Sequence, residues 1–169
     1  MSRIAAFILA LLLAAPALAS EPTPEIARVV APPQKTGVLH GLRTIPEACT
    51  RLQGEFTGDA AAPYRFAVVR TSATCQPRAQ LMDAGKAKAS VANGWILNDR
   101  IRVPSAACSS QQAVVTVWRR PANAKPPALD AQGRARIYLE EAVGQAKAGK
   151  LAAIPAYAVS MAVQGAACR

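Results

Sequence analysis

The C-terminal stretch PAYAVSMAVQGAACR (residues 155–169) contains the sharpest strand pattern in the chain. Large apolar side chains alternate with small ones from Pro155 to Val163, which predicts a strand with one bulky face. The large residues are Tyr157, Val159, Met161 and Val163. A cysteine, Cys168, follows this strand one residue before the end of the chain. We therefore expect the C-terminal stretch to be an ordered part of a sheet.

The spacing of the cysteines predicts a partner for Cys168. The segment QAVVTVW (Gln112–Trp118) is apolar on both faces, which is typical of a strand covered on both sides. An antiparallel register that pairs residue 112 with 164 also places Cys108 opposite Cys168. We therefore predict a Cys108–Cys168 disulfide.

A second pair of strands places the two other cysteines near each other. Thr50–Gly58 carries Leu52 and Phe56 on one side, and Tyr64–Arg70 also alternates. The loop between them has the length of a hairpin connection, so residue 49 faces about residue 72. This predicts a Cys49–Cys75 disulfide. Four cysteines allow three pairings, and an even number in an exported chain favours two disulfides.

Turn-forming residues and helix-capping residues predict the structure of the remaining segments. Gly94–Pro104 resembles a hairpin closed by Asn98 and Asp99. The preceding stretch, 76–93, is either a helix that starts near Pro77 or an irregular loop. Arg134–Lys150 is predicted as a helix, with a strand over Arg134–Leu139 as the competing interpretation.

Together these segments predict an α+β domain. We expect a small antiparallel sheet of about five strands, with one or two helices and two disulfides. A mostly β sandwich is the alternative.

The N-terminal region has the composition of an export signal followed by a spacer. Arg3, an apolar run from Ile4 to Ala15 and the small-residue site ALA predict a signal peptide over residues 1–19. Its apolar run is shorter than the ~20 residues that a spanning helix needs, so no transmembrane segment is expected after cleavage. Residues 20–37 contain four prolines and predict a flexible Pro-rich segment. Residues 38–169 then form one disulfide-stabilised domain in a periplasmic or secreted protein.

No pattern in the sequence supports a specific catalytic chemistry. The only histidine, His40, lies beside the Pro-rich segment and has no recognisable nucleophile motif with it. No metal-ligating or cofactor-binding spacing is present, so we predict no metal, cofactor or catalytic residue. Carboxylates that only the fold brings together could still form a small periplasmic hydrolase, which is the alternative function. The scattered candidates are Glu55, Asp59, Asp99, Asp130, Glu140 and Glu141.

The positive charge is the most informative feature for function. The chain has a formal net charge of +10, of which Arg3 is lost with the signal peptide. Arginine binds phosphate and carboxylate groups through paired hydrogen bonds, so exposed arginines favour an anionic partner. The candidate anion-binding residues are Arg65, Arg70, Arg100, Arg102, Arg119 and Arg120. Aromatic residues do not alternate with these basic residues as they do in nucleic-acid-binding surfaces, so nucleic acid is not expected.

The sequence therefore favours a non-enzymatic binding or structural module of the cell envelope. Its expected partners are lipopolysaccharide, peptidoglycan or an acidic protein.

Overall fold

A computed structural model describes residues 21–120, 131, 137–150 and 154–168. The predicted signal peptide, Asp130 and the first half of the segment for which a strand competed with a helix (Arg134–Leu139) lie outside these residues. The fold is α+β and rich in strands, as the sequence predicted, and its two disulfides are Cys49–Cys75 and Cys108–Cys168.

Within the described residues, seven strands form two sheets, where the sequence predicted about five strands in one sheet. The first sheet has the order β1 (His40–Ile45), β2 (Thr50–Phe56), β3 (Tyr64–Arg70) and is antiparallel. The second sheet has the order β4 (Gln80–Asp83), β7 (Ala156–Gly165), β6 (Gln111–Arg120), β5 (Ile96–Pro104). Its β4–β7 pair is parallel and its other two pairs are antiparallel.

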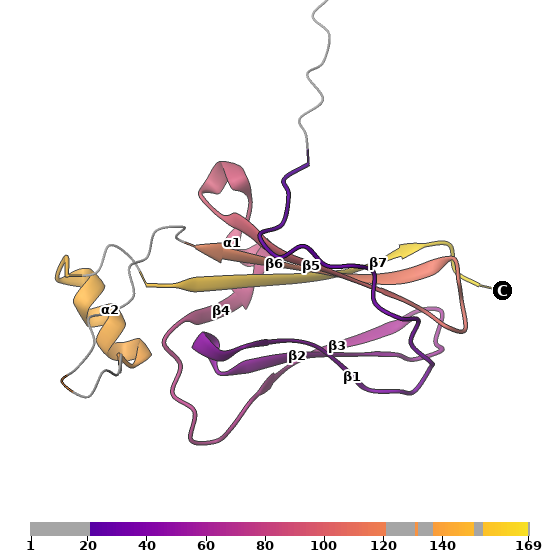
Figure 1. Cartoon of the computed structure of the whole chain (residues 1–169), viewed down its shortest axis with the longest axis horizontal. Helices are drawn as coiled ribbons and strands as arrows, with labels where there is room; N and C mark the ends of the chain where they lie inside the picture. The colour runs from indigo at the N-terminus through magenta and orange to yellow at the C-terminus, as the bar shows by residue number, and fades with distance from the viewer. Residues whose placement is uncertain (1–20, 121–130, 132–136, 151–153, 169) are drawn as a thin grey trace, which may run out of the picture.

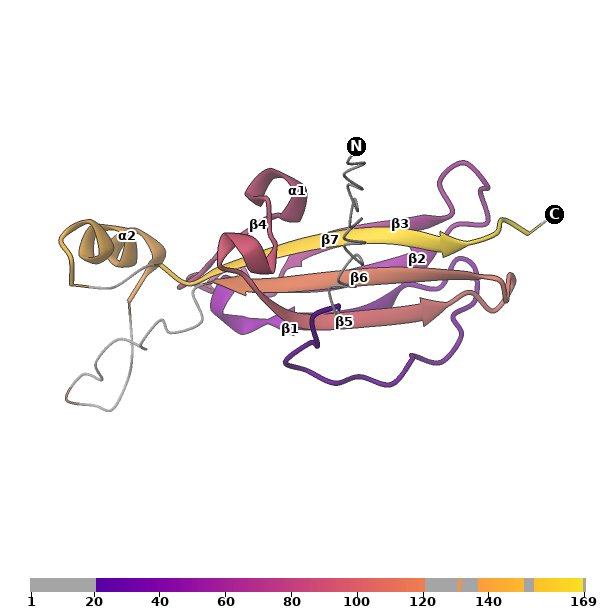
Figure 2. The same cartoon turned by 90° about the horizontal axis from the view of Figure 1, so that it is seen from above.

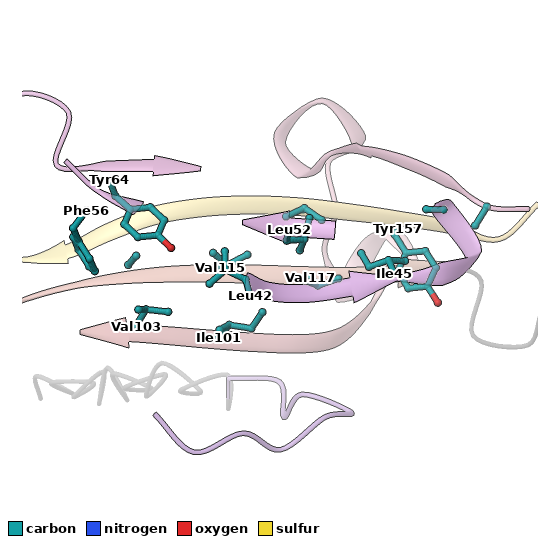
Figure 3. Close-up of a cluster of buried hydrophobic side chains, with 14 residues drawn as sticks. Leu42, Ile45, Leu52, Phe56, Tyr64, Ile101, Val103, Val115, Val117 and Tyr157 are labelled. Atoms are coloured by element: carbon teal, nitrogen blue, oxygen red, sulfur yellow. The ribbon is translucent and has the colours of Figure 1, made fainter. Parts of the chain in front are cut away.

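The two sheets lie face to face and enclose the main core (Figures 1, 2 and 3). One sheet contributes alternate residues such as Leu52 and Phe56, and the other contributes alternate residues such as Val115 and Val117. This alternation is the reason that the predicted strand patterns identified core residues correctly. β1 lies beneath β5, and β3 lies beneath β7 (Figures 1 and 2).

The registers that predicted the disulfides are present in the structure. Gln112 is opposite Gln164 in the β6–β7 pair, and Cys108 is joined to Cys168 with a Cα–Cα distance of 5.6 Å. Thr50 is opposite Arg70 in the β2–β3 pair, which leaves Cys49 and Cys75 just beyond the paired ends. Each disulfide therefore closes a strand pair at its end.

Two segments differ from their predicted structure. The predicted hairpin over Gly94–Pro104 is wrong, because β5 runs through Asn98 and Asp99 as one strand with a bulge at Asn98. The stretch 76–93 is neither one helix nor a loop alone. It contains β4, the short helix α1 (Ala84–Ala87) and a 3-10 turn (Val91–Asn93).

The helices lie outside the sandwich. Asp83 caps α1 by accepting a hydrogen bond from the Lys86 amide, and α1 then packs on the outer face of the four-stranded sheet near Trp95 and Ala158. The second helix, α2 (Leu139–Lys147), confirms the helical interpretation for its part of Arg134–Lys150 and lies beyond one end of the sandwich (Figure 1). No helix in the described ranges is long and apolar enough to span a membrane.

The N-terminal segment is attached to the domain, which corrects the prediction of a flexible spacer over 20–37. Residues 21–37, which we call the strap, run along β5 (Figure 2). The amides of Ile26, Ala31 and Gln34 donate to carbonyls of β5 at 2.8–2.9 Å. The strap therefore covers the β5 edge of the four-stranded sheet.

Gly54 is required by the packing of the first sheet. The Tyr64 ring lies over this glycine, and a Cβ at position 54 would come within 1.6 Å of the Tyr64 hydroxyl oxygen. The ring also packs edge-on against Phe56, with centroids 4.8 Å apart. A side chain at position 54 would therefore displace the Tyr64 ring from its contact with Phe56.

We expect Gly54→Ala to lower the free energy of unfolding by about 2 kcal/mol or more, because the ring of Tyr64 must move. Gly41→Ala is the matched control, since a Cβ at position 41 meets nothing within 4 Å. Urea denaturation of both variants measures the difference. Equal midpoints for the two variants would contradict the packing described here.

Candidate functional site

Two β-bulges turn a pair of charged residues into the space between the sheets. The bulge at Leu42 in β1 places Arg43 opposite Leu52, and the bulge at Asn98 in β5 places Asp99 opposite Val117. Leu52 and Val117 both point into the core. The bulges therefore give Arg43 and Asp99 core-facing positions on facing sheets.

Asp99 is the centre of this arrangement. Its side chain is fully buried and lies between two arginines. Arg28 of the strap donates from Nε to both carboxylate oxygens, at 2.9 and 3.0 Å. Nη1 of Arg43 lies 3.2 Å from Oδ2, as an ion pair whose geometry is not that of a hydrogen bond. One carboxylate thus joins the strap, β1 and β5.

A second carboxylate from the strap lies beside this group. Glu25 accepts hydrogen bonds from Asn98 at 2.7 Å and from Nε of Arg119 at 3.0 Å. The hydrogen bond from Arg119 is the main reason that the pKa of Glu25 is lowered, and Asn98 lowers it further against the opposing effect of burial. The same contact raises the pKa of Arg119. We call these six residues the strap anchor: Glu25, Arg28, Arg43, Asn98, Asp99 and Arg119.

The strap anchor is suited to holding the structure together and not to chemistry on a substrate. Asp99 has no accessible surface, so a solvent-borne substrate does not reach it. A buried carboxylate needs paired cations, because desolvation costs several kcal/mol per ion. Arg28 and Arg43 supply those cations from two different parts of the chain. The geometry therefore fastens the strap to both sheets.

The six predicted anion-binding arginines do not form one cluster. Arg65 lies on the outer face of the first sheet and pairs with Glu55. Arg70 donates to the carbonyls of Ser72, Ala73 and Cys75, so it holds the loop that contains Cys75.

The other four arginines belong to the second sheet. Arg119 is part of the strap anchor. Arg100, Arg102 and Arg120 have the same strand parity and share the outer face. Arg100 pairs with Glu21 at 2.7 Å, and Arg120 lies 5.9 Å from the centroid of the Trp95 ring.

The carboxylates considered for a hydrolase are also separated by their roles. Glu55 pairs with Arg65, Asp59 accepts from the Ala61 amide in its loop, and Asp99 is buried. Glu140 and Glu141 lie in the first turn of α2. A hollow of about 170 Å³ near Cys168 has Asp59 as its one acidic lining residue. A second hollow, of about 290 Å³ between the strap and β1, has none. These two hollows therefore offer no carboxylate pair.

His40 has structural partners at both ring nitrogens. Nε2 lies 2.8 Å from the Tyr64 hydroxyl oxygen and Nδ1 lies 3.3 Å from the Val38 carbonyl oxygen. Burial raises the pKa of the Tyr64 hydroxyl, so this tyrosine remains protonated. Within the described residues, no group of three or more His, Cys, Asp or Glu side chains could hold a metal ion.

Sequence reasoning missed the strap anchor as a group. Its members come from segments far apart in the chain, and Arg28 is separated from Asp99 by 71 residues. One local signal was available: Asp99 interrupts an otherwise apolar strand pattern in ILNDRIRVP. We interpreted that interruption as a turn, whereas it marks an inward-pointing charge.

Comparison with protein-family models, with curated proteins and with solved structures finds no match to this chain.

We expect Asp99→Asn to lower the free energy of unfolding by about 3–5 kcal/mol, because it leaves Arg43 buried without a counter-charge. Glu55→Gln is the control, since its partner Arg65 is 70% exposed and the pair should contribute less than about 1 kcal/mol. The double replacement Arg43→Leu/Asp99→Leu should recover much of the loss, because it removes both buried charges. Chemical denaturation measures all three variants. Equal losses for Asp99→Asn and Glu55→Gln would contradict the central role of Asp99.

Proposed function

We propose that this protein is an exported, non-enzymatic binding module of the cell envelope that contacts an anionic partner through its exposed basic side chains. The partner is an anionic envelope polymer, such as lipopolysaccharide or peptidoglycan, or an acidic protein. The observation that carries the proposal is how the chain distributes its charges between internal ion pairs and its surface.

Arginine side chains of the domain form ion pairs with most of the acidic side chains around the sheets. Among the residues that the structure describes, four carboxylates form ion pairs, namely those of Glu21, Glu25, Glu55 and Asp99. Asp83 is used as a helix cap. The four paired carboxylates therefore contribute little free negative charge to the outside of the domain.

Several exposed basic side chains have no such partner. Lys35, Lys86, Lys88, Arg102 and Arg120 are exposed and form no ion pair with a carboxylate in the described part of the chain. Arg102 and Arg120 lie on the outer face of the four-stranded sheet, where α1 carries Lys86. The unpaired charge of this face is therefore positive, which favours an anionic partner.

Two further observations support export and a role in binding. Two disulfides fit a protein that resides outside the cytoplasm, where thiols are oxidised. The predicted signal peptide makes the periplasm or the exterior the proposed location. The most buried carboxylate, that of Asp99, is paired with arginines of the strap anchor and is inaccessible to a substrate. This observation favours a binding function over catalysis by carboxylates.

We expect the protein to co-sediment with peptidoglycan sacculi or with anionic vesicles at low salt. Added salt should release it, because the screening length of exposed charges falls to about 10 Å at an ionic strength of about 0.1 M. Arg102→Gln/Arg120→Gln should weaken this binding and reduce its salt dependence. Lys147→Gln/Lys150→Gln, which removes the same charge from the region of α2, is the matched control. Absence of binding to every anionic surface at low salt would contradict the proposal.

A further inference from the structure

The edge of the sandwich that the strap covers combines exposed aliphatic side chains with basic ones. Val29 is 91% exposed and Leu39 is 60% exposed, and both are far more accessible than the valines and leucines of the core. Val30 and Val38 are also large exposed apolar residues, so four of them lie in or next to the strap. Concentrated apolar exposure of this kind marks an interaction surface.

One of these aliphatic residues, Val29, lines a hollow between the strap and β1. The hollow of about 290 Å³ is lined by Arg28 and Val29 from the strap and by His40 and Gly41 from β1. Val38 and Leu39 directly precede that part of β1. The segment 29–39, which carries the exposed side chains, belongs to and directly follows the strap, which runs along β5 at one edge of the sandwich (Figure 2).

The strap anchor holds the exposed residues in place. Arg28 turns inward to reach Asp99, and Ala31 packs against the main core. Val29 and Val30, which lie between these two residues, project into solvent from a segment that hydrogen bonds hold at Ile26 and Ala31. Pro32 and Pro33 further restrict the backbone. The surface is consequently preorganised for a partner.

The part of the chain that carries these aliphatic residues contains basic but no acidic residues, because the acidic residues of the strap, Glu21 and Glu25, precede it. From residue 26 to residue 46 the chain has no acidic residue, whereas it has Arg28, Lys35 and Arg43. Lys35 is exposed, and Arg28 uses only its Nε in contacts with described residues. Aliphatic side chains flanked by cations match a bilayer interface that contains anionic headgroups. An acidic protein surface would match the cations but offers less to the projecting valines and leucine.

We infer that the strap edge is a contact surface for an anionic lipid bilayer, with Val29, Val30, Val38 and Leu39 entering the interface and Arg28 and Lys35 contacting phosphates. This inference rests on the proposed function, because it assigns a lipid headgroup as the anionic partner and the strap edge as the surface that meets it. The protein would lie on the bilayer by this edge and would not cross it.

The test uses vesicles of equal parts phosphatidylglycerol and phosphatidylethanolamine, with phosphatidylcholine vesicles as the neutral control. Val29→Ser/Leu39→Ser should bind the anionic vesicles about tenfold more weakly than the wild type, because two apolar side chains no longer leave water. Val91→Ser/Val68→Ser is the matched control, since these valines are also exposed but lie on other parts of the domain. Its affinity should equal that of the wild type.

A second measurement reports insertion directly. In Val29→Trp, the added tryptophan emission should shift to the blue on anionic vesicles and not on neutral ones. Val91→Trp should show no shift. Thermal unfolding confirms that each variant is folded, which is expected because the replaced side chains lie on the surface.

Each outcome separates this inference from the proposed function. Loss of binding in Val29→Ser/Leu39→Ser alone, together with the blue shift at position 29, supports the inference. Unchanged vesicle binding by that variant overturns the strap edge as the surface but leaves the proposed function in place. Binding to peptidoglycan sacculi without binding to vesicles has the same consequence. Binding to neither surface at low salt overturns both.

Discussion

The structure depends on one buried carboxylate that is neutralised from two directions. Asp99 points from β5 into the space between the sheets, where it meets Arg43 of β1 and Arg28 of the strap. A lone carboxylate would not be stable there, because the cost of desolvation exceeds what packing can offset. This contact depends on the two bulges, on the face-to-face arrangement of β1 and β5 and on the attachment of the strap. Replacement of the group by apolar residues would preserve packing but would remove the contact that fastens the strap.

The parts of the fold that local pattern determines were predictable. Alternation in Thr50–Phe56 and Ala156–Gly165 identified core faces. A hairpin length led to Cys49–Cys75, and an antiparallel register between Gln112–Trp118 and the C-terminal strand led to Cys108–Cys168. The errors arose where a local signal has two meanings. Asn98 and Asp99 resemble a turn, but the same pair forms a bulge and an inward charge once Arg28 and Arg43 are near. No short window of sequence contains that information.

The strap illustrates the same limit. Its prolines remove amide donors and predict a chain without regular structure. The remaining amides of Ile26, Ala31 and Gln34 nevertheless find acceptors on β5, whose outer edge is otherwise unpaired. The internal use of Glu21 and Glu25 to hold this segment also leaves the basic side chains without counter-charges. The same contacts that order the strap therefore produce the charged and apolar surface on which the proposals about function rest.

Native-state amide hydrogen exchange tests the role of Asp99 most directly. The account predicts that the amides of Ile26, Ala31 and Gln34 are protected in the wild type and lose protection in Asp99→Asn. The amides of β6 should remain protected in that variant under conditions where it is folded. Exchange of the three strap amides at the rate of an unstructured peptide in the wild type would contradict the account.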